Sequence, residues 1–129
     1  APLDALLKTA DLVSLHLPLT KETERIIDAE KLALLKPSAI LINVGRGALV
    51  DEAALAAALR AGKLAMAACD VFAEEPPPPG HPLRGLANVI LTPHLAGSTR
   101  EAGGRIIDMA LTNLIRVLKG EAPRWVLNL

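Results

Sequence analysis

Short apolar runs alternate along the chain with segments in which apolar and polar residues repeat with a helical period. The apolar runs predict four β-strands, over residues 12–16, 39–43, 64–69 and 88–91. The periodic segments predict helices over residues 3–9, 29–35, 52–61 and 99–119. Strands separated by helices pair in parallel through right-handed crossovers, so this order predicts an α/β fold built on a parallel sheet.

Residues that start and stop helices support these boundaries. Asp28, Asp51 and Ser98 are suitable N-caps because their side-chain oxygens can accept a hydrogen bond from the first turn. Gly62 follows the third helix as a stop signal. The run over residues 39–43 is apolar at successive positions, which is typical of a strand covered on both faces.

The segment Pro76–Pro82 contains too many prolines for a helix or a central strand, because proline lacks the amide donor. It predicts a stiff surface loop inside a domain. The last predicted helix carries one apolar stripe, formed by Ile107, Ala110, Leu111, Leu114 and Leu118. Gly120 ends this helix, and an extended tail is expected over residues 121–129.

Length and composition fit one globular domain of 129 residues, of which 51% are hydrophobic. Fourteen basic residues balance fourteen acidic ones, so nothing favours nucleic acid or an anionic membrane as a partner. No apolar run approaches the roughly 20 residues that span a bilayer, and the first residues lack a signal-peptide pattern. The single cysteine, Cys69, cannot form an internal disulfide and is interpreted as a small buried apolar residue. A cytoplasmic location is therefore expected, and no cluster with metal-ligand spacing is present in the sequence.

Three short segments place chemically active side chains directly after predicted strands. They are Asn43-Val44-Gly45-Arg46-Gly47, Asp70-Val71-Phe72-Ala73-Glu74-Glu75-Pro76 and Pro93-His94-Leu95-Ala96-Gly97. Open α/β sheets bind ligands at the carboxyl ends of their strands. There, an arginine can grip a carboxylate and a histidine beside an acid can move a proton, which suits the interconversion of 2-hydroxy and 2-keto acids.

These segments, in this order and spacing, resemble the D-isomer-specific 2-hydroxyacid dehydrogenases over nearly the whole chain. The resemblance implies the second half of a Rossmann-like NAD(P)-binding domain over residues 1–98. Residues 99–129 would return toward a substrate domain. It also implies NAD as cofactor, with NADP not excluded, and a homodimer.

The resemblance assigns three catalytic residues. Arg46 would bind the substrate carboxylate, although by its local pattern it could instead cap a helix. His94 would exchange the hydroxyl proton, whereas His16 and His81 have no supporting context and are interpreted as structural or exposed. The acid that pairs with His94 would be Glu75, next to Pro76. Its neighbour Glu74 is the competing candidate, and both could simply be solvated.

The resemblance also assigns residues to the cofactor. Asp70 would accept a hydrogen bond from the nicotinamide carboxamide, or would otherwise cap the following turn. Leu17 lies in a loop expected near the adenosine, which could instead be a solvated turn. The remaining cofactor contacts are Val44, Gly45, Arg46, His94 and Gly97. The glycines beside Arg46 are expected to let the backbone turn sharply and approach a ligand.

The phosphate-binding pattern Gly-x-Gly-x-x-Gly occurs nowhere in this sequence. We therefore expect the isolated chain to bind NAD weakly or not at all, to be inactive, and to self-associate through apolar surface at the sheet edge. Two other functions stay open. One is a nicotinamide-sensing binding module with the same fold, and the other is an inactive truncated product.

Overall fold

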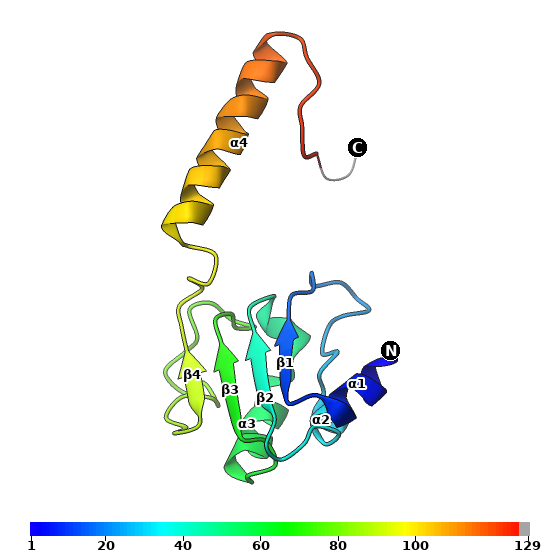
Figure 1. Ribbon diagram of the computed structural model, residues 1–129. Helices are drawn as coiled ribbons and strands as arrows, with labels where there is room; N and C mark the ends of the chain where they lie inside the picture. Colours follow the sequence, from blue (N-terminus) through cyan, green and yellow to red (C-terminus); the bar gives the residue numbers. More distant parts are fainter. Residues whose placement is uncertain (127–129) are drawn as a thin grey trace. The chain divides into compact units, whose positions relative to one another are not determined.

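The computed structural model describes residues 1–126, which form two compact units, residues 1–94 and the residues from 95 onward. The first unit holds a four-stranded parallel sheet in the order β1-β2-β3-β4 (Figure 1). The strands are β1 (Leu12–Leu15), β2 (Ile40–Asn43), β3 (Met66–Cys69) and β4 (Val89–Leu91). The predicted α/β fold with a parallel sheet is confirmed. The division at residue 98, with its functional assignment of the two parts, stays a prediction.

The helices of the first unit follow the predicted pattern. They are α1 (Leu3–Thr9), α2 (Ala29–Leu32) and α3 (Glu52–Arg60), with a 3-10 turn η1 (Gly47–Leu49) after β2. Asp28 and Asp51 are N-caps as predicted, since their carboxylates accept hydrogen bonds from the backbone of Lys31 and Ala54. Helix α2 is shorter than predicted, because the chain after Leu32 continues as a turn.

The second unit contains one long helix, α4 (Arg100–Leu118). Thr99 caps it by accepting a hydrogen bond from Ala102, so the prediction of Ser98 as the cap was wrong by one residue. The chain leaves the helix through Gly120 in the left-handed region at φ 74°, as expected for a glycine stop. The tail has no regular structure through residue 126, and the rest of its predicted extended course lies outside the described residues.

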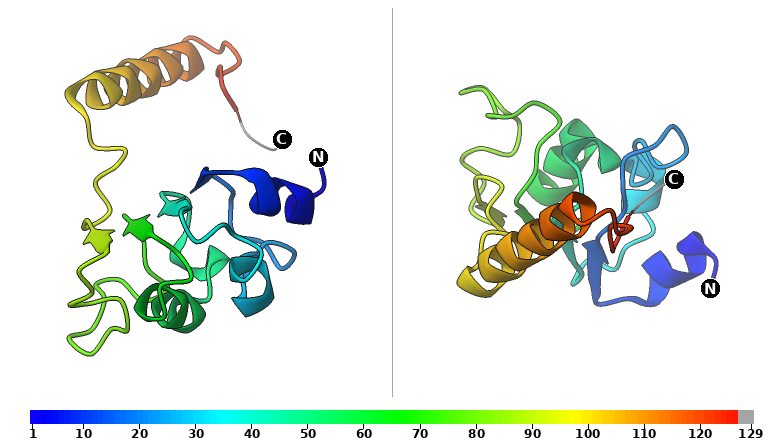
Figure 2. Two further views of the ribbon diagram at one scale, coloured as in Figure 1. Left: turned by 60° about the horizontal axis from the view of Figure 1, so that its bottom comes forward. Right: turned by 90° about the horizontal axis from the view of Figure 1, so that it is seen from above.

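The sheet is covered on one face within the first unit (Figure 2). Side chains alternate along β1, β2 and β3, and the buried set includes Val13, Leu41 and Ala67. This face packs with Leu32, Leu55 and Leu59 of the helices, and with Leu7 of α1, into one core. The expectation that β2 is covered on both faces was wrong for this unit. Ile40 and Ile42 are only partly buried, since they point away from that core.

The open face of the sheet is apolar. The register aligns Leu12, Ile40 and Met66 in one row across β1, β2 and β3. The next row on this face holds Ser14, Ile42, Ala68 and Ile90. Leu12 and Ile90 are each 55% exposed and Met66 is 38% exposed. The exposed apolar surface therefore spreads over a sheet face as well as its β1 edge.

The proline-rich segment, which was predicted to be a surface loop, is attached to the core by buried side chains and hydrogen bonds. Its prolines are partly or fully exposed, but His81 and the adjoining Leu83 are buried. Arg60 donates to the carbonyl of Pro82 at 2.7 Å and Arg84 donates to that of Pro77 at 2.8 Å. The loop therefore packs onto the core through the residues at its end.

The loop after β2 packs directly against the loop after β3 at Gly47. A Cβ built on Gly47 would lie 1.8 Å from the carbonyl carbon of Phe72 and 2.2 Å from the amide nitrogen of Ala73. A Cβ on Gly45 would lie 3.0 Å from the carbonyl oxygen of Leu17. Neither glycine has a positive φ. They permit close packing of protein on protein, whereas the sequence had suggested sharp turns and approach to a ligand.

Replacing Gly47 by alanine should destabilise the chain, because the new methyl group meets the backbone of Phe72 and Ala73. Overpacking of this kind costs about 1–3 kcal/mol, and urea unfolding followed by circular dichroism would measure it. Gly80→Ala is the matched control, because a Cβ there meets nothing within 4 Å. Equal stabilities for the two variants would contradict the packing described here.

Candidate active site

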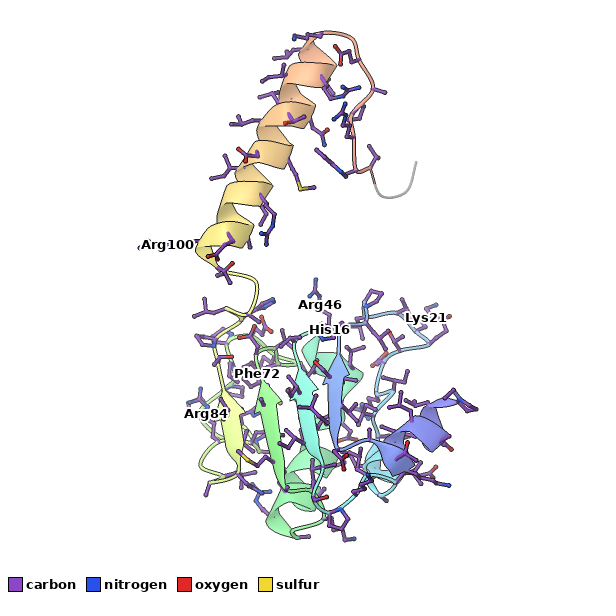
Figure 3. The ribbon with its side chains drawn as sticks, in the orientation of Figure 1. His16, Lys21, Arg46, Phe72, Arg84 and Arg100 are labelled. Atoms are coloured by element: carbon purple, nitrogen blue, oxygen red, sulfur yellow. The ribbon has the colours of Figure 1, made fainter. Side chains whose placement is uncertain are left out.

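The parallel register brings the ends of β2, β3 and β4 to one edge of the sheet. Asn43 pairs with Cys69, and Cys69 pairs with Leu91, so the loops that follow these residues start side by side. Figure 3 shows Arg46 and His16 at this edge of the first unit. The predicted site residues Arg46, Asp70 and His94 thus leave the sheet from neighbouring strands.

The loop that carries Arg46 is braced by Asn43, a buried residue to which the sequence analysis gave no role. Its side-chain amide donates to the carbonyl of Arg46 at 2.9 Å, and its amide oxygen accepts from Gly45 N–H at 3.1 Å. A buried amide with both ends satisfied holds a loop in one conformation. A polar residue ending an otherwise apolar strand was the signal that could have identified it.

His94 has an unusual backbone. Its φ is 55°, in the left-handed region that non-glycine residues seldom occupy, at a cost of about 1 kcal/mol. Its amide donates to the carbonyl of Asp70 at 2.8 Å, which fixes the turn after β4 against the end of β3. The fold therefore holds this histidine in a conformation that a free chain avoids.

Glu75 pairs with His94, as predicted from its place before Pro76. Its Oε2 lies 2.8 Å from Nδ1 of His94, and its Oε1 accepts from the amide of Phe72 at 2.9 Å. The hydrogen bond with His94, followed by that from Phe72, lowers the pKa of the Glu75 carboxyl below its ordinary value of 4.5. Since Nδ1 faces an ionised carboxylate, Nε2 is the ring nitrogen left to face a ligand. Glu74 is exposed and does not make this pair.

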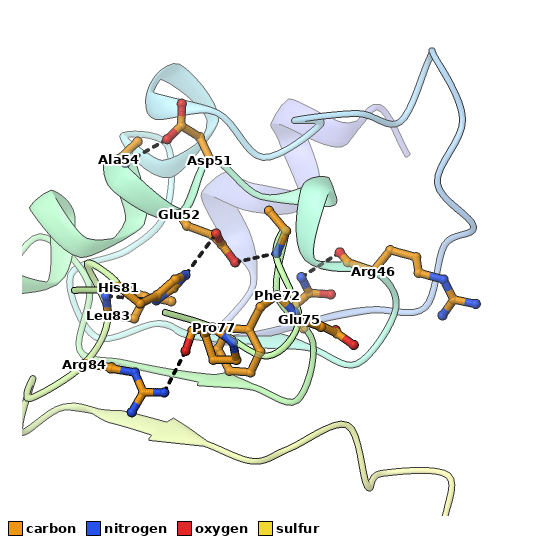
Figure 4. Close-up of polar contacts among 12 residues, drawn as sticks. Arg46, Asp51, Glu52, Ala54, Phe72, Glu75, Pro77, His81, Leu83 and Arg84 are labelled. Carbon is orange, nitrogen blue, oxygen red and sulfur yellow. Dashed lines mark hydrogen bonds and ion pairs between the residues drawn. The ribbon is translucent and has the colours of Figure 1, made fainter. Parts of the chain in front are cut away.

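One cavity of about 370 Å³ is lined by Arg46, Glu75 and His94, with Leu19, Gly47, Ala48, Phe72 and Ala73 completing its wall. The Arg46 guanidinium extends away from the Glu75 carboxylate (Figure 4) and donates to the carbonyl of Gly45 at 2.7 Å. Guanidinium has five N–H donors, so this one bond leaves donors for an anion. The cavity thus offers a cation and an imidazole–carboxylate pair to one small ligand.

Asp70 is buried, and its side chain accepts a hydrogen bond from the hydroxyl of Thr92. This contact ties the end of β3 to the end of β4. Cys69 beside it is buried too, and burial, with the nearby charge of Glu52, raises the pKa of its thiol to about 12. The interpretation of Cys69 as an inert buried residue agrees with that shift.

The other predicted cofactor residues lie in the loops after β1 and β2 and in the second unit. Val44 and Gly45 lie in the loop braced by Asn43. Leu17 is 41% exposed in the loop after β1. Gly97 belongs to the second unit, so its contact with a cofactor stays a prediction.

Comparison with known proteins identifies the family to which this chain belongs. Residues 1–96 match the family model described as the D-isomer specific 2-hydroxyacid dehydrogenase, NAD binding domain. The chain belongs to this family. The resemblance drawn from the sequence is thereby confirmed.

Individual members of this dehydrogenase family are similar to this chain in sequence and structure over nearly its whole length. A glyoxylate reductase of Thermofilum pendens is 52% identical over 98% of this chain and 37% of its own length. A D-3-phosphoglycerate dehydrogenase of Archaeoglobus fulgidus is 43% identical over 98% of this chain and 24% of its own. The structure of a D-lactate dehydrogenase with NAD+ from Lactobacillus jensenii has a TM-score of 0.90 at 36% identity, covering all of this chain and 43% of that one. The chain thus spans less than half the length of these relatives.

The backbone amides of Val44 and Gly45, in the loop after β2, are already engaged within the protein. The amide of Gly45 is already bonded to Asn43, and that of Val44 approaches the carbonyl of Leu15 at 3.4 Å. These residues would therefore contact a cofactor through their surfaces and carbonyls rather than by donating to phosphate.

Residues 1–126 contain neither a metal-binding cluster nor a membrane-spanning helix. No group of three or more His, Cys, Asp or Glu in this range could hold a metal ion. Within the same range, no helix is both long enough and apolar enough to cross a membrane.

The pairing of Glu75 with His94 predicts one tautomer. In its neutral form His94 should carry hydrogen on Nδ1, because Glu75 accepts there, and long-range ¹H–¹⁵N NMR spectra of the ring would show it. Glu75→Gln should shift these ring nitrogen signals, whereas the adjacent Glu74→Gln should leave them unchanged. A wild-type His94 with hydrogen on Nε2 would be incompatible with the pair.

Proposed function

We propose that the protein containing this chain is an NAD-dependent oxidoreductase that interconverts a D-2-hydroxy acid and the corresponding 2-keto acid. The single observation that carries the proposal is the shared cavity of Arg46, Glu75 and His94, with Glu75 Oε2 2.8 Å from His94 Nδ1. Family membership and the names of the relatives support the substrate class, which includes glyoxylate, hydroxypyruvate and phosphoglycerate types.

Each of the three residues has a defined task in this proposal. Arg46 binds the substrate carboxylate with the N–H groups that it does not spend on Gly45. His94 uses Nε2 to take the hydroxyl proton during oxidation and to return it during reduction. Glu75 fixes the orientation of the imidazole and stabilises its protonated form, and its lowered pKa keeps it ionised for this task.

The cofactor would lie against the same edge of the sheet. When bound, NAD supplies the hydride acceptor or donor. Asp70 orients the nicotinamide carboxamide. Its course would be lined by Val44, Gly45, Arg46 and His94, and Leu17 would extend it. NADP is the alternative cofactor, since a structural relative is solved with NADPH. A cytoplasmic location fits the single buried cysteine.

Turnover by the longer protein would test this function. We expect it to reduce glyoxylate, hydroxypyruvate or 3-phosphohydroxypyruvate with loss of NADH absorbance. His94→Gln should lower kcat by about 10²–10⁴-fold while the affinity for NADH stays nearly unchanged. Glu74→Gln is the control and should keep wild-type kcat.

The outcomes separate the alternatives left open by the sequence. A wild-type protein that binds NADH without turning over any of these keto acids would be a nicotinamide-sensing module. A protein that neither binds nor turns over would be an inactive product. Full activity in His94→Gln would remove the proton-transfer role from this residue.

We further propose that the chain self-associates, as a homodimer or larger, through the open face of its sheet. Leu12, Met66 and Ile90 expose apolar surface there, which soluble proteins normally cover. Sedimentation velocity of the wild-type chain should show species larger than a monomer. A double variant with Leu12→Lys and Ile90→Lys should sediment mainly as a monomer. A wild-type chain that stays monomeric at all concentrations would refute this assembly.

A further inference from the structure

A second histidine–carboxylate pair lies buried beneath the candidate site. Nε2 of His81 is 3.1 Å from Oε2 of Glu52, and the two side chains are only 5% and 16% exposed. The amide of Leu83 approaches Nδ1 of His81 at 3.4 Å. Nδ1 therefore accepts, and Nε2 carries the hydrogen that Glu52 receives.

Glu52 reaches this position because it is the first residue of α3, next to the N-cap Asp51. A carboxylate at a helix N-terminus is stabilised by the exposed amides and by the helix dipole. The second oxygen of Glu52, Oε1, accepts from the amide of Ala73 at 3.0 Å (Figure 4). Both oxygens of the carboxylate are thus used, one on His81 and one on the backbone of the loop after β3.

The contact with Ala73 connects the buried pair to the cavity. Ala73 directly follows Phe72, whose amide donates to Glu75 Oε1, and Glu75 holds His94. Two consecutive amides are therefore held by two different carboxylates, Phe72 by Glu75 and Ala73 by Glu52. The ring of Phe72 also packs edge-on against that of His81, with centroids 5.4 Å apart and planes at 84°.

We propose that Glu52 and His81 are positioning residues for the Glu75–His94 pair. Glu52 holds the Ala73 amide, and His81 orients the Glu52 carboxylate and supports Phe72. Together they fix the segment from which Glu75 reaches His94. This proposal rests on the proposed function for its catalytic consequence, but the effect on the His94 ring is independent of turnover. Catalytic groups tolerate displacements of about 0.5 Å, so loosening this segment should cost rate more than binding.

The test compares Glu52→Ala and Glu52→Gln with Arg84→Gln. The glutamine variant retains an acceptor for the Ala73 amide but loses the charge and the acceptor for His81. Arg84→Gln is the matched control, because it removes another tie of the proline-rich loop, a hydrogen bond to the Pro77 carbonyl rather than to Phe72, Ala73 or Glu75. Hydrogen exchange at the Phe72 and Ala73 amides and the ¹⁵N signals of the His94 ring are read in the 129-residue chain. The values of kcat and KM are read in the longer protein.

For Glu52→Ala we expect amide exchange at Phe72 and Ala73 at least about tenfold faster, shifted His94 ring nitrogens, and kcat lowered about tenfold with KM for NADH within about twofold. Glu52→Gln should show smaller changes in the same direction, and it keeps the test decisive if the alanine variant fails to fold. Arg84→Gln should match the wild type in all readouts.

Two results would overturn the proposal. One is a folded Glu52→Gln with wild-type amide exchange, His94 signals and kcat, and the other is an Arg84→Gln that reproduces the losses of the Glu52 variants. If the longer protein shows no turnover while the Glu52 variants still shift the His94 ring, the positioning stands and the proposed function fails. If turnover is present and the Glu52 variants change neither the ring nor kcat, the positioning fails and the proposed function stands.

Discussion

Contact between two backbones at Gly47 is the constraint on which the candidate site depends. The loop after β2 carries Arg46, and the loop after β3 carries Glu75. The Cα of Gly47 lies where any side chain would enter the Phe72–Ala73 peptide. Because the loops touch there, Arg46, Glu75 and His94 line one cavity although they are far apart along the chain. Parallel strands bring the loops to one edge, but the glycine contact sets how closely they approach.

Carboxylates then hold the segment that Gly47 touches. Glu75 and Glu52 accept from the adjacent amides of Phe72 and Ala73, and each also meets a histidine. The two pairs differ in environment. His94 is about half exposed at 52% and can meet a ligand, whereas His81 is buried at 5%. The same pairing of groups thus occurs once at the surface, where we propose that it moves a proton, and once beneath it, where we propose that it positions the first pair.

In the first unit, helices cover one face of the sheet and leave the other face exposed. Helices α2 and α3 cover the face that includes Val13, Leu41 and Ala67, while Leu12, Met66 and Ile90 remain exposed opposite. The matched part makes up 37% of the glyoxylate reductase and 24% of the phosphoglycerate dehydrogenase named above. An apolar surface of this kind suits association with further protein, and it leaves the carboxyl edge of the strands accessible to a ligand.

Sequence alone determined the secondary-structure elements and predicted which residues form the candidate site. Apolar runs, capping aspartates and the glycine stops fixed the strands and helices to within a few residues, because these signals are local. The place of Glu75 before Pro76, read through the family resemblance, identified the partner of His94 ahead of Glu74. The sequence could not predict the roles of Asn43, Gly47, Glu52 and His81. Their partners lie in other loops, and which backbone or side chain each one meets depends on how those loops pack. Only the tertiary structure showed that the glycines beside Arg46 pack against other backbone segments and that one face of the sheet is exposed. It also showed that the largely buried Glu52 carboxylate accepts a hydrogen bond from the loop that carries Glu75.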